Sequence, residues 1–341
     1  MWWFPLLLPT VAAARLVSHD FLVAAPTMPA RRPITDAGLT WRTLGGEMVP
    51  AVYVVAPRAM PMYHNANSTV FVPQVKPRDI VFGYRHPGDY RLAHTPLTAH
   101  GRNKYKWMLY GDDDTLWLMD AVARLVEPFD HTMPVMLSDN FWKCMGSTYI
   151  SHGMRVCYDR NQDVPRCSAC HGPHVPGLVR GCPCRSPEDT CEANLPPTLY
   201  LKDDMEKNFS YTKEKCVAGE YRFHHFGGAG LILSVAAVEA LVGQSDTYDK
   251  CVLRYRSRGN EESLEFGDLV ASQCIRETIG LGYTDTGLYP FGFDRHPSVE
   301  ALERAVRDEG RTNAISVHLH CSEEECEEAA RRVMQATRHT I

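Results

Sequence analysis

Three consecutive aspartates, Asp112, Asp113 and Asp114, follow a short apolar run and one glycine. Adjacent carboxylates repel one another, and a bound cation is the simplest way to keep all of them ionised. A divalent ion held by one or two of them would leave open positions for the oxygens of a diphosphate. The alternative is a solvated acidic turn that caps a following helix, where the helix dipole favours negative charge.

The elements around the aspartates place them at one edge of a sheet. The aromatic run Trp107–Tyr110 predicts a buried strand, and Gly111 permits a sharp turn. Apolar residues at helical spacing then predict a helix from about Thr115; they are Leu116, Met119, Val122, Leu125 and Val126. Open α/β sheets bind ligands outside the carboxyl ends of their strands, so this is a position for a binding site.

The segment KWMLYGDDDTLWLMDAVARLVEPFDH resembles the metal-binding segment of fringe-like glycosyltransferases, in the plant and fungal branch of glycosyltransferase family 31. The resemblance implies an α/β fold of the GT-A nucleotide-diphospho-sugar transferase type, with a central mixed sheet. It implies a UDP-sugar donor and Mn²⁺ held by Asp114, with Asp112 or Asp113 assisting. Asp112 and Asp113 are also expected to contact the donor or the acceptor.

The segment from Arg222 to Gly230, which ends in Gly-Gly-Ala-Gly, extends the resemblance. Family members carry a similar run beside the donor sugar and the acceptor, followed by a strand and a helix, here Leu231–Ser234 and 235–242. The resemblance therefore assigns Gly228, Ala229 and Gly230 to the sugar-binding pocket. Without it, these residues would be read as a glycine-rich turn.

A third matching element contains Asp268 between two cysteines. In relatives the two cysteines are paired, which implies a disulfide between Cys251 and Cys274. Asp268 aligns with the carboxylate that acts as general base, and an inverting transfer needs such a base to accept the proton of the attacking hydroxyl. The alternative is an acidic residue that only stabilises a helix N-terminus.

Near the end of the chain, residues 314–320 alternate like a strand, and fringe-like enzymes end their catalytic domain with a similar Ser-x-His segment. The resemblance assigns His318, rather than His320, as the histidine that completes the metal site. A single histidine on a strand is otherwise more often structural. A last helix is expected to about Arg338, with Cys321 and Cys326 close enough to pair.

Residues 141–221 form an insert with eight of the chain's 12 cysteines. They are Cys144, Cys157, Cys167, Cys170, Cys182, Cys184, Cys191 and Cys216. An even number of cysteines in a segment with few apolar residues favours disulfides in a secretory compartment. Zinc binding and a short haem-attachment pattern, Cys167-Ser-Ala-Cys170-His171, are the alternatives.

The first 30 residues are assigned to a signal peptide or the remnant of an N-terminal anchor, and residues 31–341 to one catalytic domain. Residues 51–55, 69–72, 80–82 and 135–137 predict strands, whereas the helices of the N-terminal third have no recognisable pattern. Tyr90 and Arg91 are candidate donor contacts. Two Asn-x-Ser/Thr sequons, at Asn67 and Asn208, agree with a Golgi or secreted location.

The resemblance implies inverting, metal-dependent transfer of a hexose or N-acetylhexosamine from a UDP-sugar to a glycan or glycoprotein hydroxyl, with a β1,3 linkage. A net charge of -5 gives no reason to expect a nucleic-acid partner, and membrane contact is expected only through an N-terminal anchor. One alternative is a catalytically inactive, secreted carbohydrate-binding protein of the same fold. Another is a zinc-binding or redox protein built on the insert.

Overall fold

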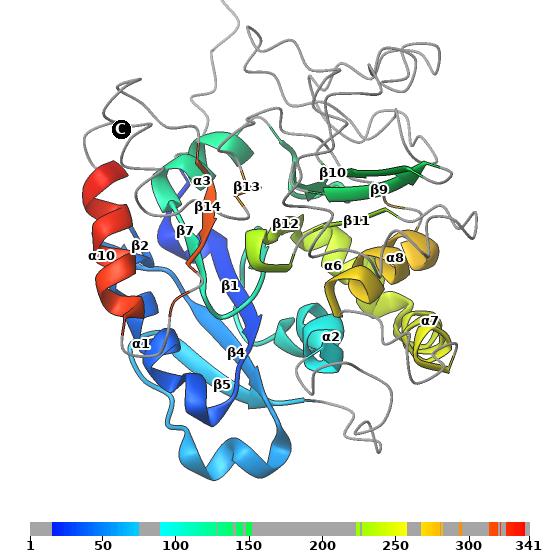
Figure 1. The fold of residues 1–341 in the computed structure, drawn as a ribbon, viewed down its shortest axis with the longest axis horizontal. Coiled ribbons are helices and arrows are strands. Elements are labelled where there is room, and N and C mark those ends of the chain that lie inside the picture. Colours follow the sequence, from blue (N-terminus) through cyan, green and yellow to red (C-terminus); the bar gives the residue numbers. More distant parts are fainter. Residues whose placement is uncertain are drawn as a thin grey trace, which may run out of the picture.

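The computed structural model describes residues 16–74, 89–127, 129–138, 141–145, 148–151, 223–225, 227–257, 267–279, 281, 293–294, 314–319, 321 and 325–337. It is a mixed α/β structure around a six-stranded sheet with the strand order β5-β4-β1-β6-β12-β8 (Figure 1). The α/β class and the central mixed sheet expected from the sequence are therefore confirmed.

One half of this sheet is parallel and the other is antiparallel. The parallel half contains β5 (Thr69–Pro73), β4 (Ala51–Val55), β1 (Phe21–Pro26) and β6 (Trp107–Tyr110). In the other half, β12 (Leu231–Ser234) runs antiparallel to both β6 and β8 (Met136–Leu137). Parallel strands end at the same edge, so the residues after β1 and after β6 lie near each other.

Helices cover both faces of the sheet. Alternate residues of β6 point to opposite sides: Trp107 and Leu109 belong to one buried apolar cluster, Met108 and Tyr110 to the other. The first cluster includes residues of α1 (Arg32–Trp41), α3 (Met119–Val126) and α10 (Cys326–Thr337). The second includes residues of α2 (Asp89–Ala99), α6 (Val235–Gly243), α7 (Ser245–Ser257) and α8 (Gly267–Ile279). Burial on both faces explains why these strands read as continuous apolar runs.

The N-terminal third contains the βα units that the sequence did not reveal. The strand β1 lies between β4 and β6, with Val23 beside Ala51 on one side and Leu109 on the other. The folded domain therefore includes residues before 31, and our domain boundary at that residue was too late. Helix α1 begins directly after the short turn Pro29–Arg31. Residues 1–15 lie outside the described part of the chain, so the leader stays a prediction.

Thr115 begins a strand and not the helix that we predicted. The strand β7 (Thr115–Trp117) pairs antiparallel with β14 (Ser316–His318), and β14 pairs with β13 (Phe293–Asp294). Helix α3 begins only at Met119. The β-branched and aromatic side chains of Thr115 and Trp117 suit a strand, and the partner strand about 200 residues later overrides the helical spacing of Leu116.

The other predicted elements have mixed outcomes. The strands at 51–55 and 231–234 and the helix at 235–242 are confirmed, the expected strand at 69–72 is β5, and the expected C-terminal helix is α10. The strand expected at 135–137 is the shorter β8, and the strand expected at 314–320 is limited to β14. The predicted strand at 80–82 and seven of the eight insert cysteines lie outside the described residues.

The insert begins with regular structure. A three-stranded antiparallel sheet has the order β10-β9-β11, from β10 (Thr148–Ser151), β9 (Phe141–Met145) and β11 (Phe223–His225). Strand β9 carries Cys144, while residues 152–222 are not described. Among the described helices, none combines the length and the hydropathy that a membrane crossing requires.

Candidate metal centre

The acid turn, which we define as Asp112 to Asp114, connects β6 to β7 across a very tight bend. The Thr115 amide donates to the Asp112 carbonyl at 3.2 Å, which closes the turn. A β-carbon added at Gly111 would lie 2.7 Å from Thr115 Oγ1 and 3.3 Å from Gly230 Cα. Only glycine fits this position, and the three carboxylates follow immediately at the carboxyl edge of the central sheet.

The backbone of β14 brings His318 to this turn. His318 lies opposite Thr115 in the antiparallel pairing of β14 with β7. The next amide, that of Leu319, donates to the Asp114 carbonyl at 3.1 Å. His318 Nε2 is 3.2 Å from Asp114 Oδ1, and both side chains are largely buried. Two segments separated by about 200 residues are therefore held in register at the site.

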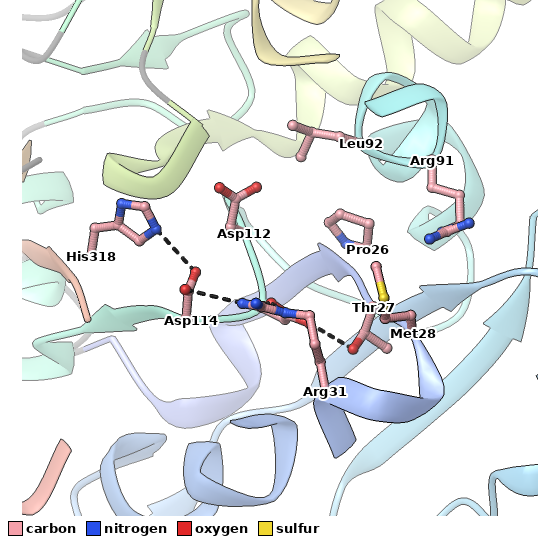
Figure 2. Close-up of a pocket in the computed structure, with 10 residues that line it drawn as sticks. Pro26, Thr27, Met28, Arg31, Arg91, Leu92, Asp112, Asp114 and His318 are labelled. Atoms are coloured by element: carbon pink, nitrogen blue, oxygen red, sulfur yellow. Dashed lines mark hydrogen bonds and ion pairs between the residues drawn. The ribbon is translucent and has the colours of Figure 1, made fainter. Parts of the chain in front are cut away.

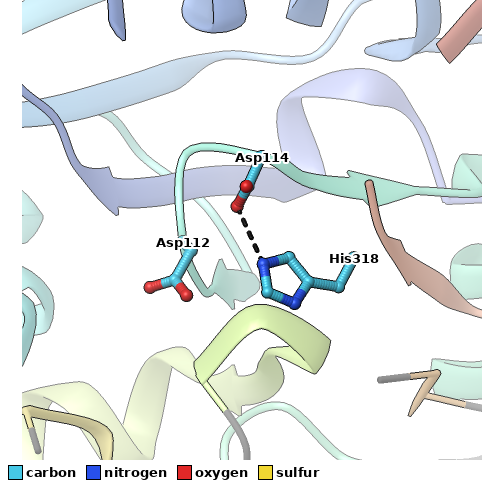
Figure 3. A group of neighbouring side chains, drawn as sticks. All are labelled: Asp112, Asp114 and His318. Carbon is cyan, nitrogen blue, oxygen red and sulfur yellow. Dashed lines mark ion pairs between the residues drawn. The ribbon is translucent and has the colours of Figure 1, made fainter. Parts of the chain in front are cut away.

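Asp112, Asp114 and His318 form a group that could hold a metal ion (Figure 3). Each residue offers one ligand atom, and the three atoms lie within 4.8 Å of one another. Asp114 Oδ1 is buried and accepts no well-oriented hydrogen bond within the described part of the chain. Two carboxylates with one imidazole form a donor set that divalent transition-metal ions accept. The residues present therefore fit a divalent ion.

The two carboxylates of this group have pKa values displaced in opposite directions. Burial and the charge of Asp114 raise the pKa of Asp112 to about 7. For Asp114, burial favours the neutral form, but the close contact with His318 and the charges of His318 and Arg31 outweigh it and lower the pKa. The same pairing with Asp114 raises the pKa of His318 against the effect of its burial. Asp114 therefore carries its negative charge, the form that a metal ligand requires.

Asp113 points to a different set of partners, which the sequence analysis missed. Thr27 Oγ1 donates to Asp113 Oδ2 at 2.7 Å, and Arg31 Nε donates to Asp113 Oδ1 at 2.8 Å. Arg31 Nη2 lies 2.6 Å from Asp113 Oδ1 and 3.0 Å from Asp114 Oδ2. Burial raises the pKa of Asp113, although Arg31 opposes this effect. The middle aspartate therefore ties the acid turn to the loop between β1 and α1.

A cavity of about 320 Å³ opens between these elements (Figure 2). It is lined by Pro26, Thr27, Met28, Arg31, Arg91, Leu92, Asp112, Asp113, Asp114 and His318. Two guanidinium groups, from the β1–α1 loop and from α2, thus share one cavity with three carboxylates. Arg91 was one of the two candidate donor contacts, and the side chain of the other, Tyr90, lies outside the described residues.

The glycine loop, which we define as Gly228 to Gly230, lies behind His318. A β-carbon added at Gly228 would come within 2.1 Å of His318 Nδ1. Gly230 has a φ of +74°, and a β-carbon there would lie 2.6 Å from the Trp117 ring. All three residues of the loop are buried, and the ten side chains that line the cavity do not include them. The structure thus places this loop as a support for His318.

Three hydroxyl groups, from β7, from β14 and from the residue after β8, hold the carbonyls of the glycine loop. Thr115 Oγ1 donates to the Gly228 carbonyl at 3.0 Å, and Ser138 Oγ donates to the Gly230 carbonyl at 3.5 Å. Ser316 Oγ donates to the Ala229 carbonyl. Buried carbonyls satisfied in this way restrict the loop, and with it the plane of the His318 ring.

Asp268 lies in the first turn of α8, partly exposed, and its charge contributes to the raised pKa of Asp112. The proposed base is therefore within electrostatic range of the metal-ligand group. Cys251 of α7 and Cys274 of α8 form a disulfide with a Cα–Cα distance of 5.6 Å, as the resemblance implied. Cys321 and Cys326 also form a disulfide.

No protein-family model matches this chain, and the search of curated proteins found no match either.

Proposed function

We propose that this protein is a metal-dependent glycosyltransferase of the GT-A type that transfers a sugar from a UDP-sugar with inversion. The observation that carries the proposal is the group of Asp112, Asp114 and His318 beside a cavity that also contains two arginines. Its place at the carboxyl edge of an α/β sheet is the usual place for a nucleotide ligand. The fringe-like motifs supply the choice of a sugar nucleotide and of a β1,3 linkage.

The cavity has the chemistry that a nucleoside diphosphate requires. Asp112, Asp114 and His318 would hold Mn²⁺, which would supply positive charge to the departing diphosphate. Arg31 and Arg91 line the same cavity, and guanidinium groups bind phosphate oxygens through paired N–H donors. The volume of about 320 Å³ lies at the lower end for small-molecule sites, which suits a diphosphate with part of its nucleoside or sugar.

Asp268 is the proposed general base. Its carboxylate would accept the proton of the acceptor hydroxyl as that oxygen bonds to the anomeric carbon and the bond to the UDP oxygen breaks. Attack from the face opposite UDP inverts the anomeric configuration. Two features support this role: Asp268 lies near enough to Asp112 to affect its pKa, and the Cys251–Cys274 disulfide restrains the helix that carries it.

The alternative of an inactive carbohydrate-binding protein rested on the lack of recognisable βα units in the N-terminal third. That observation no longer supports it, because β1, β4 and β5 are parallel strands of the central sheet beside the site, and helix α1 follows β1. The alternative of a zinc or redox protein rests on cysteines that mostly lie outside the described residues. A Golgi or secreted location, and a glycan or glycoprotein acceptor, belong to the same proposal.

The experiment is binding and hydrolysis of UDP-Gal, UDP-GlcNAc, UDP-Glc and UDP-GalNAc by the full chain, with Mn²⁺ or with EDTA. We expect one donor to be preferred and its binding to require the metal. An Asp114→Asn variant should no longer bind the donor when Mn²⁺ is added. An Asp36→Asn variant, which changes an exposed acid on α1, should retain Mn²⁺-dependent donor binding. Folded protein that binds none of the four donors with Mn²⁺ would contradict the proposal.

A further inference from the structure

We infer that Arg31 makes metal binding and diphosphate binding depend on each other. In this role it weakens the binding of the metal alone and strengthens the binding of the metal together with the diphosphate. The inference rests on the proposed function for the identity of the anion. It concerns a residue that no motif singled out, on the loop between β1 and α1.

Arg31 and the metal would share one carboxylate. Arg31 Nη2 lies 3.0 Å from Asp114 Oδ2, and the other oxygen of this carboxylate, Oδ1, lies 3.2 Å from His318 Nε2 (Figure 2). A divalent ion bound by Asp114 would thus lie across a single carboxylate from the guanidinium. Like charges at such separations repel appreciably even in a well-screened environment, so Arg31 opposes the metal.

Arg31 is also held where it cannot easily move away. Asp113 accepts from both Nε and Nη2, and Thr27 Oγ1 fixes the other oxygen of Asp113. The Asp113 side chain is 5% exposed, whereas the Arg31 side chain is 31% exposed and lines the cavity. The buried carboxylate therefore anchors the arginine, and the guanidinium keeps one side open to a ligand. An arginine that only stabilised the fold would need no exposure to the cavity.

The charges of the cavity show why an anion would reverse the effect. With His318 neutral, the form that can bind a metal, the three carboxylates exceed the two guanidinium groups by one charge when all of them are ionised. Without metal, the cavity is therefore not attractive to a diphosphate. A bound divalent ion makes the net charge of the cavity positive, and the anion then neutralises this excess positive charge. Because linkage is reciprocal, the anion must strengthen metal binding by the same factor.

The test is the replacement Arg31→Met, which keeps an unbranched side chain and removes the charge. Mn²⁺ binding alone is followed by the electron paramagnetic resonance of the free ion, and UDP binding at saturating Mn²⁺ by calorimetry. We expect Mn²⁺ alone to bind about tenfold more tightly and UDP to bind about tenfold more weakly, from charge interactions of this size. A purely structural role would weaken both.

Two further variants control for folding and for net charge. Arg31→Lys keeps the charge and should hold both affinities close to those of the natural chain. Arg58→Met removes the same charge from an exposed position outside the cavity and should change neither affinity. Circular dichroism and thermal unfolding of each variant show whether the fold is retained.

The outcomes separate this inference from the proposed function. If the natural chain binds Mn²⁺ and UDP together but Arg31→Met changes neither affinity, or weakens both, the coupling role is wrong and the function stands. If Arg31→Met does not fold, Arg31→Gln, which removes the charge and keeps a polar side chain, replaces it: tighter Mn²⁺ binding with weaker UDP binding supports the role, and unchanged or jointly weakened affinities oppose it. If the natural chain binds no Mn²⁺, both proposals fail.

Discussion

The two sides of the metal-ligand group are held in place by different physical means. On the acid side, Asp112 to Asp114 depend on charge: Arg31 pairs with Asp113 and Asp114 at the wall of an open cavity. On the histidine side, His318 depends on packing and on neutral hydrogen bonds, because Gly228 leaves no room behind its ring and buried hydroxyls hold the glycine loop. The strength of ion pairs changes with bound ligands and with pH, whereas close packing does not depend on either.

This contrast suggests that the two sides have different roles. The histidine side holds one metal ligand in a fixed position, and the acid side makes the affinity for the metal depend on which other ligands are bound. Asp114 belongs to both, since it contacts Arg31 through one oxygen and His318 through the other. The predictions below are ordered from the largest expected effect to the smallest.

Asp268, the proposed general base, lies on neither side, so its removal should leave the metal site intact. Asp268→Asn should lower turnover by about 10²- to 10⁴-fold, the usual contribution of a general base, while UDP and Mn²⁺ bind as before. Steady-state transfer assays and calorimetry on the same preparation measure the two properties. Unchanged turnover would remove Asp268 from the mechanism.

The addition of one methyl group at Gly228 should displace His318 on the histidine side. Gly228→Ala places a β-carbon where the His318 ring now lies, so the ring must shift and Mn²⁺ affinity should fall by about 10- to 100-fold, as for other groups that orient a metal ligand. The matched control is Gly243→Ala, at the end of α6, where a β-carbon would meet nothing within 4 Å. Equal affinities for both variants would show that packing does not position His318.

The acid side should respond to pH. The pKa of Asp112 is raised to about 7, so below that value a proton occupies the carboxylate and must leave before a metal can bind. His318, whose pKa is also raised, must lose its proton as well, so Mn²⁺ affinity should rise with pH through this range, and each pH unit below about 7 should cost up to about tenfold for each of the two protons. Titrations between pH 5.5 and 8.5 measure this dependence. An affinity that is flat across this range would contradict the account of Asp112.

The smallest effect is expected from the outermost contact of the acid side. Thr27→Val removes the hydroxyl that donates to Asp113 Oδ2 and keeps the shape of the side chain. Because Thr27 acts on the metal only through Asp113 and Arg31, Mn²⁺ affinity should change by less than about tenfold, below the usual effect of groups bonded directly to a ligand. Thr27→Ser, which retains the hydroxyl, is the control. A larger loss would mean that Asp113 itself binds the metal.

Local patterns predicted the buried strands well and the site only in part. The apolar runs at 51–55 and 231–234 are bounded by residues that end strands, and these strands form as expected. The spacing of Leu116 and Met119 fits a helix and equally fits a strand followed by a helix. The segment from Thr115 is a strand because it pairs with β14, a partner distant in the sequence that no local pattern reveals.

The most informative failure concerns β1 and Arg31. Residues 1–30 are so apolar at their start that we read the whole segment as a leader, and this hid the strand that lies beside β6. Without β1, nothing indicated that the next loop shares an edge of the sheet with the acid turn. A search for a strand just after the apolar run, at Phe21–Ala25, would have found the signal.

The resemblance to fringe-like enzymes contributed what local patterns could not. It singled out His318 and Asp112 to Asp114, and the structure brings Asp112, Asp114 and His318 together. It also implied the Cys251–Cys274 disulfide, which the structure contains. It assigned Gly228 to Gly230 to the sugar pocket, whereas their contacts in the structure are with His318, Trp117 and three hydroxyls.

The measurement that tests the central claim most directly is Mn²⁺ binding to the natural chain and to Asp114→Asn, followed by the electron paramagnetic resonance of the free ion. The account predicts one site in the natural chain and a loss of affinity of at least about 100-fold in the variant, since Asp114 is the carboxylate that both sides share. Equal binding by the two folded proteins, or no binding by either, would contradict it.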